Sequence, residues 1–485
     1  MTSIQDTGRS GGDKVSRRAV LRASALAGLG IGIAGTVGTM AAPEAFAQPR
    51  PDAGYGPVVP DPEKLLAVPE RFRYTVVAEA GVTTLSDGGE PTPSDPDGTA
   101  CFARRSGGYT LVNNHEIGGD EPHHVPNRDG LTYDPAAGGG TTNVEVGTNG
   151  ERVGEYVSVA GTHNNCAGGA TPWETWLTCE ETEDTAGTNG LTRDHGFVFE
   201  VSPDGRENAG NSPVPLRFLG RFPHEAVAVD PRSNTIYLTE DATGPNGLLY
   251  RWVPPHGFRG GRWELKKLAE SAGGDTAGRF QAMRALRGDR PVRDLSEATQ
   301  PGTSYRVEWV DVPDRSAATD STRNQLPADR ITRSHKFEGA WWGTTGAYVV
   351  ASFARPDDGS AHAHDGQIWF YDPNRQTITL KVIFPVDEDA DRDGSNYDGP
   401  DNITGSPYGG VVVAEDGDGV QHLVGVDAFG RPYTLARNDL NDSEFAGPTY
   451  SPDRRYLFAG IQSPGHVVAI TGPWRSSGPP GFVGG

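Results

Sequence analysis

The segment Ile236-Tyr-Leu-Thr-Glu240-Asp241, an apolar strand that ends in two acids, decides the fold because the chain repeats it. Each copy is followed by a glycine-containing turn and another strand. The six copies lie at 109–116, 176–181, 236–241, 347–352, 411–416 and 456–462. A period of about 40 to 60 residues with several strands per unit is the signature of a β-propeller. Two stacked β-sandwiches would not place a carboxylate at the same point of each unit, so we expect an all-β, six-bladed β-propeller.

The composition agrees with many short strands joined by tight turns. The chain has 66 glycines, 38 prolines and only 3 methionines among 485 residues, which disfavours a helical bundle. We expect the propeller to span 71–475, with a partly helical insertion at about 255–304 between the third and fourth blades. The helical part of that insertion is expected at 263–286. Residues 476–485 would form a tail.

The N-terminus carries an export signal. Arg17 and Arg18 precede an apolar stretch rich in glycine and alanine, and Ala45-Phe46-Ala47 matches a cleavage site. Paired arginines of this kind are recognised by the twin-arginine translocase. The alternative is an uncut membrane anchor, which the glycine content and the cleavage pattern disfavour. We therefore expect a signal at 1–47, a linker at 48–70, and a secreted or extracytoplasmic protein without stable membrane insertion.

Net charge and cysteine content narrow the function further. The formal net charge of −21 repels nucleic acid and anionic lipid. An anionic substrate would need bound cations to reverse the local field. The three cysteines are too few, and odd in number, for a disulfide framework.

The repeat has a chemical consequence. The innermost strands of a propeller line a central channel, and their ends meet at one mouth. The polar side chains expected there are Glu116, Glu180, Glu225, Glu240, Glu338, Asn402, Glu415 and Glu444. Crowded carboxylates cannot all stay ionised without counter-charge, and the motifs hold hardly any lysine or arginine. Metal ions are the expected balance.

The donor types indicate which metals would bind. Oxygen-rich clusters suit calcium, while Cys179, His115 and His224 would add softer ligands that suit a transition metal. Each residue also has an ordinary interpretation, since a lone cysteine is commonly a small buried hydrophobe and an acidic strand end a solvated turn. Repetition at one structural position favours the metal site. A separate run, Asp389-Ala-Asp391-Arg-Asp393-Gly394, resembles half of a calcium loop without its closing glutamate.

Several motifs resemble the PhoX alkaline phosphatase family. The most specific stretch is Gly161-Thr-x-x-Asn-Cys166-Ala-Gly-Gly followed by Thr171-Pro-Trp and Trp176-Leu-Thr-Cys179-Glu180-Glu181. Further matches are Asn114-His115-Glu116, Gly220-Arg-Phe-x-His224-Glu225, Thr239-Glu240-Asp241, Gly399-Pro-Asp401-Asn402 and Phe445-Ala-Gly. The resemblance runs from about residue 70 to 470.

The resemblance implies hydrolysis of small-molecule phosphomonoesters at a site of calcium and ferric iron, with no covalent phospho-enzyme. It implies that Cys179 is an iron ligand and that Glu180, Glu225, Glu240 and Glu338 bind metal. With the repeat, the expected metal ligands are Asn114, His115, Glu116, Cys179, Glu180, Glu225, Glu240, Glu338, Asn402 and Glu415. Glu180 and Glu240 are also expected to be catalytic.

The fourth-unit motif departs from the family pattern. It reads Lys336-Phe337-Glu338-Gly339 where Arg-Pro-Glu-Gly is expected. Arg251, Lys336 and Arg355 are the candidates for contacting phosphate. Two other functions are consistent with the pattern: a calcium-dependent lactonase or esterase propeller, in which Cys179 would be idle, and a non-catalytic binding propeller with structural calcium. No G-x-S-x-G nucleophile motif occurs in residues 48–485, after the expected export signal.

Overall fold

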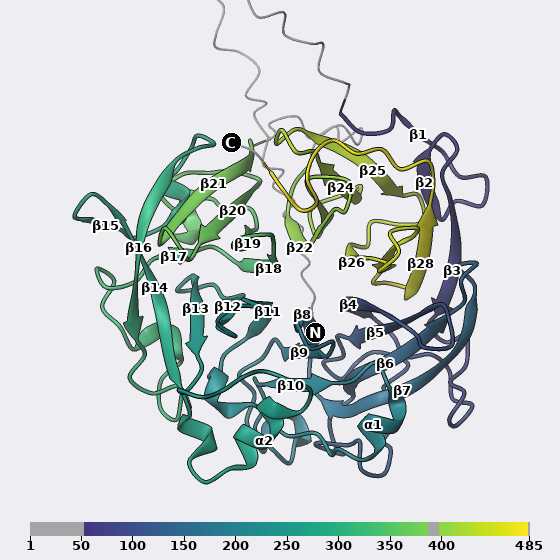
Figure 1. Cartoon of the computed structure of the whole chain (residues 1–485), viewed down its shortest axis with the longest axis horizontal. Helices are drawn as coiled ribbons and strands as arrows, with labels where there is room; N and C mark the ends of the chain where they lie inside the picture. The colour runs from purple at the N-terminus through teal and green to yellow at the C-terminus, as the bar shows by residue number, and fades with distance from the viewer. Residues whose placement is uncertain (1–52, 387–396, 484–485) are drawn as a thin grey trace, which may run out of the picture. The chain divides into compact units, whose positions relative to one another are not determined.

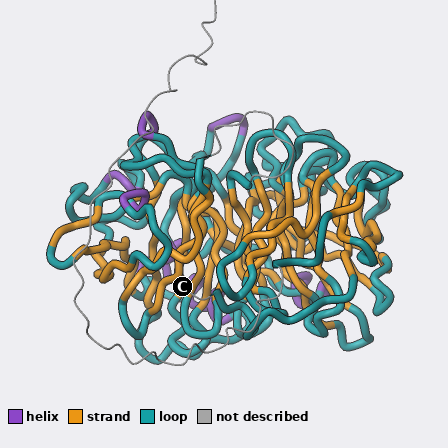
Figure 2. Tube along the Cα trace, turned by 90° about the horizontal axis from the view of Figure 1, so that it is seen from above, coloured by secondary structure: helices purple, strands orange, loops and turns teal. Residues whose placement is uncertain are grey.

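We describe the protein from a computed structural model that covers residues 53–386 and 397–483. The export signal and the acidic run at 389–394 lie outside the described residues. The described chain is almost entirely β-structure in a propeller-like arrangement (Figure 1). Figure 2 shows the strands in the middle of the molecule, with loops on both faces. The all-β expectation is thus confirmed.

The strands form five antiparallel sheets. One four-stranded sheet contains β4 (Pro96–Ala103), β5 (Tyr109–His115), β6 (Gly139–Val146) and β7 (Arg152–Thr162). A three-stranded sheet contains β8 (Asn165–Ala170), β9 (Trp176–Glu180) and β10 (Val198–Val201). A six-stranded sheet contains β22 (Pro400–Gly405), β23 (Val411–Glu415), β24 (His422–Val426), β25 (Pro432–Asn438), β2 (Leu66–Pro69) and β1 (Val58–Val59).

A second four-stranded sheet joins the two ends of the described chain. It contains β26 (Phe445–Tyr450), β27 (Leu457–Ile461), β28 (His466–Thr471) and, from the N-terminal side, β3 (Arg73–Glu79). Strand β3 hydrogen-bonds antiparallel to β28 along its whole length, from Arg73 opposite Thr471 to Glu79 opposite His466. Through this pairing, the arrangement is closed by residues far apart in sequence.

The largest sheet has eleven strands and does not match a simple blade. Its order is β11 (His224–Val229), β12 (Ile236–Glu240), β13 (Gly247–Val253), β14 (Arg279–Arg287), β16 (Ser304–Asp311), β21 (Thr377–Phe384), β20 (Gly366–Asp372), β19 (Ala347–Ala351) and β18 (Phe337–Trp342), with β15 (Arg290–Val292) on β14 and β17 (Arg333–Ser334) on β13. Strand β16 pairs with both β14 and β21, which makes one continuous sheet where two separate units were expected.

The insertion contains less helix than the sequence suggested. Helix α2 covers only Glu264–Glu270, and the second described α-helix, α1, covers Gly205–Ala209. The remainder of the expected helical stretch includes β14, which is hydrogen-bonded on both sides. This pairing overrides the local helix propensity. In the part of the chain that the structure describes, helices are all too short or too polar to cross a membrane.

The first strand of each repeat lies nearest the centre: β4, β8, β11, β18, β22 and β26, called the inner strands below (Figure 1). Each contacts the next, and β26 returns to contact β4. Apolar clusters fill the space between neighbouring sheets, for example Leu177 and Val198 against Val227 and Leu238. The inner strands therefore surround one channel, into which their first residues can project.

Candidate metal centre

Every inner strand carries a β-bulge near its start. Against its partner strand, each shows a one-residue register shift, for example from His224 to Val227 in β11 and from Phe337 to Ala340 in β18. The shifts in the other four strands lie between Pro96 and Thr99, Asn165 and Gly168, Pro400 and Ile403, and Ala446 and Thr449. A bulge re-aims the side chain of the extra residue. In five of these strands the bulge contains a potential metal ligand: Asp97, Cys166, Glu225, Glu338 or Asp401.

Glycines permit the close approach of the inner strands at these bulges. A Cβ atom added to Gly98 would lie 2.6 Å from the Cα atom of Ala167 on the next inner strand. A Cβ on Gly339 would lie 2.6 Å from the carbonyl oxygen of Asp401. Neither backbone atom can move without shifting a strand, so these positions require glycine.

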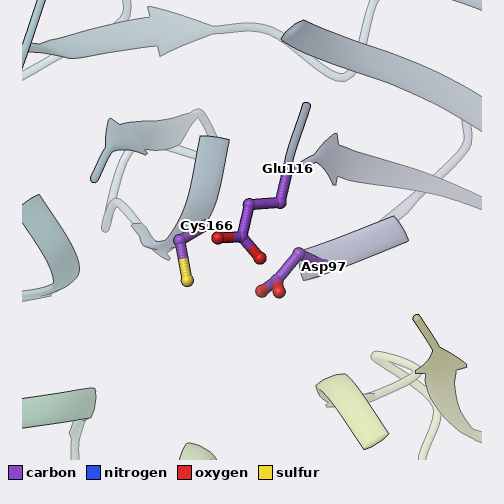
Figure 3. Close-up of side chains that lie close together, drawn as sticks. All are labelled: Asp97, Glu116 and Cys166. Carbon is purple, nitrogen blue, oxygen red and sulfur yellow. The ribbon is translucent and has the colours of Figure 1, made fainter. Parts of the chain in front are cut away.

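Three overlapping groups of donor atoms result. They are Asp97 with Glu116 and Cys166, Cys166 with Glu181 and Glu225, and Glu225 with Glu338 and Asp401; within each, the donor atoms lie within 4.8 Å of one another. Figure 3 shows the first group gathered between the inner strands. We call the seven residues the acid ring. Cys166 and Glu225 each belong to two groups, so the ring is one continuous centre.

Burial makes the ring electrostatically costly without cations. Asp97, Glu225 and Glu338 are almost completely buried, at 1%, 1% and 3% exposure. Burial first, and the neighbouring carboxylates second, hold the pKa values of Asp97 and Glu225 well above their usual range. The same burial raises the pKa of Glu116 to about 7. Such shifts mark a site that binds either protons or positive ions.

The donor set fits metal ions. Within the described residues, the buried atoms Asp97 Oδ1 and Glu225 Oε1 have no hydrogen-bond partner, although a buried carboxylate oxygen ordinarily has one. Neutral amides occupy other positions: Asn164 Nδ2 donates to Glu116 Oε1 at 3.1 Å, and Gln462 Nε2 donates to Glu116 Oε2 at 2.7 Å. Free carboxylate oxygens beside a thiol suit a hard and a softer cation together.

The structure brings Glu116, Glu225 and Glu338 into the ring, as expected from sequence, but places Glu180 elsewhere. Glu180 Oε1 accepts hydrogen bonds from the backbone N–H of His163 at 3.0 Å and from His195 Nδ1 at 2.6 Å. Its Oε2 accepts from the backbone N–H groups of Gly196 and Phe197. These four donors use the carboxylate inside its own sheet, and the next residue, Glu181, reaches the ring instead.

Glu240 and Glu415 follow the same pattern. Glu240 accepts hydrogen bonds from Tyr250 Oη at 2.9 Å and from an Arg323 guanidinium nitrogen at 3.1 Å. Glu415 accepts from His422 Nδ1 at 2.6 Å and from the Asp398 backbone N–H at 3.1 Å. Both carboxylates are hydrogen-bonded within the fold, and neither belongs to the three donor groups.

The cysteine positions are exchanged relative to the expectation. Cys179 is fully buried in an apolar cluster with Leu177, Val198 and Phe218, and burial raises the pKa of its thiol well above the usual value. Cys166 is the thiol beside the carboxylates. The signal that could have identified it is the bulge motif Asn165-Cys166-Ala-Gly, which occupies the place of His224-Glu225-Ala.

The remaining polar candidates support the ring without belonging to its three groups. Asn114 Nδ2 donates to the carbonyl oxygens of Cys166 and Ala167, both at 2.7 Å, and so holds that bulge. His115 lies between the Ser94 carbonyl and the Thr142 hydroxyl. Asn402 Oδ1 accepts from the Gly447 backbone N–H at 2.6 Å, and its neighbour Asp401 is the ring member.

The three basic candidates for contacting phosphate lie in different surroundings. Arg251 bonds to Gln281 and stacks over Trp309, 4.7 Å from the ring centroid, within the sheet. Arg355 pairs with Asp365. Lys336 alone of these three contacts the ring, through Glu338. The sequence alone did not indicate which of the three contacts the acid ring.

A propeller-like fold with carboxylates and a thiol gathered at its centre is typical of a metal-binding β-protein. The sequence model of alkaline phosphatase PhoX matches residues 53–153 and 148–465. The chain belongs to this family, and it is a hydrolase of phosphate monoesters.

The solved structure of a PhoX protein has a fold similar to that of this chain. PhoX from Pseudomonas fluorescens, in complex with vanadate as a transition state analogue, has a TM-score of 0.63 at 17% identity, over 86% of this chain and 97% of that chain. The gluconolactonase XC5397 from Xanthomonas campestris has a TM-score of 0.40 at 11% identity, over 87% of this chain and 99% of that one. No protein with a curated description matches the sequence.

Proposed function

We propose that the acid ring is the active site at which this chain hydrolyses phosphate monoesters. The observation that carries the proposal is the series of three donor groups, in which Cys166 links the first to the second and Glu225 links the second to the third. Asp97 and Glu225 also have unpartnered oxygens. A chain of net charge −21 repels a phosphate dianion unless positive charge is gathered where the substrate binds.

The ring residues divide by donor type. Asp97, Glu116, Glu181, Glu225, Glu338 and Asp401 offer carboxylate oxygens suited to calcium, and Cys166 offers sulfur suited to iron. When bound, such ions supply Lewis-acid charge to the phosphoryl group and make water a better nucleophile. The protein residues hold and orient this charge, and Lys336 adds an ammonium at one side of the ring.

We further propose that the propeller has six blades. The eleven-stranded sheet then counts as two blades, β11 to β14 and β18 to β21, bridged by β16. Support comes from the six inner strands, each with the same bulge and each in contact with the next. We also propose export by the twin-arginine route on the basis of Arg17, Arg18 and the cleavage pattern ending at Ala47.

A side-by-side assay tests the function. The protein purified after export is given an aryl phosphate and the matching aryl carboxylic ester, each with and without added calcium. We expect turnover of the phosphate alone, dependent on calcium. Ester turnover without phosphatase turnover would overturn the proposal in favour of a lactonase or esterase, and turnover of neither would favour a binding propeller.

A further inference from the structure

Lys336 lies directly before inner strand β18, with its side chain directed among the acids. Its Nζ atom is 3.2 Å from Asp241 Oδ2 and 3.2 Å from Glu338 Oε1. Both carboxylates are well shielded, with side-chain exposures of 14% and 4%. The backbone of Lys336 has a φ of 45°, a conformation that costs a non-glycine residue energy. The local chain is therefore held in an unfavourable conformation that places an ammonium between two acids.

The ammonium lies at a kind of residue pair that recurs around the channel. In three consecutive repeats, an acid directly follows the second strand, and the next inner strand carries a donor residue in its bulge. Two such pairs, Glu116 with Cys166 and Glu181 with Glu225, lie inside the candidate metal groups. Asp241 follows β12 and Glu338 is the bulge residue of the next inner strand, so they are the third pair of the series.

Within the described residues, neither of the first two pairs forms an ion pair with a lysine or an arginine, whereas both acids of the third pair form one with Lys336. The Lys336 ammonium forms ion pairs with both carboxylates of this pair, each at 3.2 Å. An ion of calcium size binds oxygens at about 2.4 Å. Small inward movements of about 1 Å of the two carboxylates would therefore let such an ion replace the ammonium.

We infer that Lys336 is a built-in cation that takes the place of one metal ion at the third pair and confines metal binding to the rest of the ring. This inference rests on the proposed metal-dependent function of the ring. It concerns the number of ions, so it can fail while the phosphatase proposal holds. Unlike a bound ion, the ammonium cannot be removed by a chelator.

Metal counting tests the inference. Wild type, Lys336→Met and the control Lys266→Met are stripped with chelator, dialysed against calcium chloride and measured by elemental analysis and calorimetric titration. Lys266 serves as the control because its side chain is also largely shielded, at 11% exposure against 25% for Lys336, and it bonds to the Ser212 carbonyl instead of the ring acids. We expect Lys336→Met to bind one more calcium ion per chain than wild type, and Lys266→Met to bind the wild-type number.

The double variant Lys336→Met with Asp241→Asn removes one charge of each sign and should return to the wild-type count. An unchanged count in folded Lys336→Met would overturn the inference. If Lys336→Met folds only when calcium is present, and then holds the extra ion, the inference stands. If it fails to fold at any calcium concentration while the double variant folds, calcium cannot replace the ammonium and the inference fails.

Discussion

Glu180 and Glu181 are consecutive residues whose carboxylates serve different parts of the molecule. Glu180 is hydrogen-bonded to His195 Nδ1 at 2.6 Å within its own sheet, whereas Glu181 lies with Cys166 and Glu225 in the acid ring. Successive side chains along an extended chain point to opposite faces. Strand β9 ends at Glu180, and Glu181 is the next residue. One acid stabilises the fold and its neighbour builds the centre.

This relationship predicts opposite phenotypes for two similar substitutions. Glu181→Gln should lower phosphatase activity by about 100-fold or more, because the ring loses a carboxylate that would hold a metal ion and so stabilise charge in the transition state. The melting temperature should change little. Glu180→Gln should lower the free energy of unfolding by about 3 kcal/mol, because a buried acid that pairs with His195 is neutralised. Kinetics and thermal unfolding of the two variants measure this, and equal loss of activity at equal stability would contradict it.

The two buried cysteines give a second matched comparison. Cys166→Ser should reduce the bound iron, because a hydroxyl is a poor replacement for a thiolate ligand. Cys179→Ser should leave the metal content unchanged and destabilise the fold by about 1 to 3 kcal/mol, because it puts a hydroxyl into an apolar cluster. Elemental analysis and denaturant unfolding distinguish the two, and loss of iron in Cys179→Ser would reverse our assignment.

Metal removal should change how stability depends on pH. In the metal-free protein, burial raises the pKa of Glu116 from 4.5 to about 7, so the folded state holds a proton that the unfolded state releases. Stability then falls as the pH rises from about 4.5 to 7. With calcium bound, the acids stay ionised and this slope should disappear. Melting temperatures across that range, with chelator and with excess calcium, give the comparison; parallel curves would argue against a cation site.

His195 predicts a second pH effect, independent of metal. Burial disfavours its charge, but the carboxylates of Glu180, 2.6 Å away, and Asp134, 3.4 Å away, outweigh burial and raise its pKa above 6.5. The stabilisation is complete below pH 6.5 and is lost as the pH rises through the folded-state pKa. The stability difference between wild type and His195→Asn should therefore be largest near pH 6 and smaller at pH 9. The exposed His362 provides a control position, since His362→Asn changes a histidine at the surface of the fold.

The sequence by itself determined the class of architecture and the kind of chemistry. Repeated strands with acids at one point required an all-β protein with a polar centre, because equivalent positions in a repeat occupy equivalent places in space. Glu116, Glu225 and Glu338 could be assigned to that centre on this ground. The motifs around Cys166 also indicated the phosphatase family correctly.

Only the tertiary structure decided which acid of each pair reaches the centre. A shift of one residue moves a side chain to the other face of a strand. A one-residue shift would therefore exchange the roles of Glu180 and Glu181, or of Glu240 and Asp241, and composition contains no information about it. Five of the seven ring residues lie in the bulges of the inner strands, and these bulges form through pairing with neighbouring strands. Cys166 and Lys336 acquire their places in the same way, because both depend on contacts between blades that are distant in sequence.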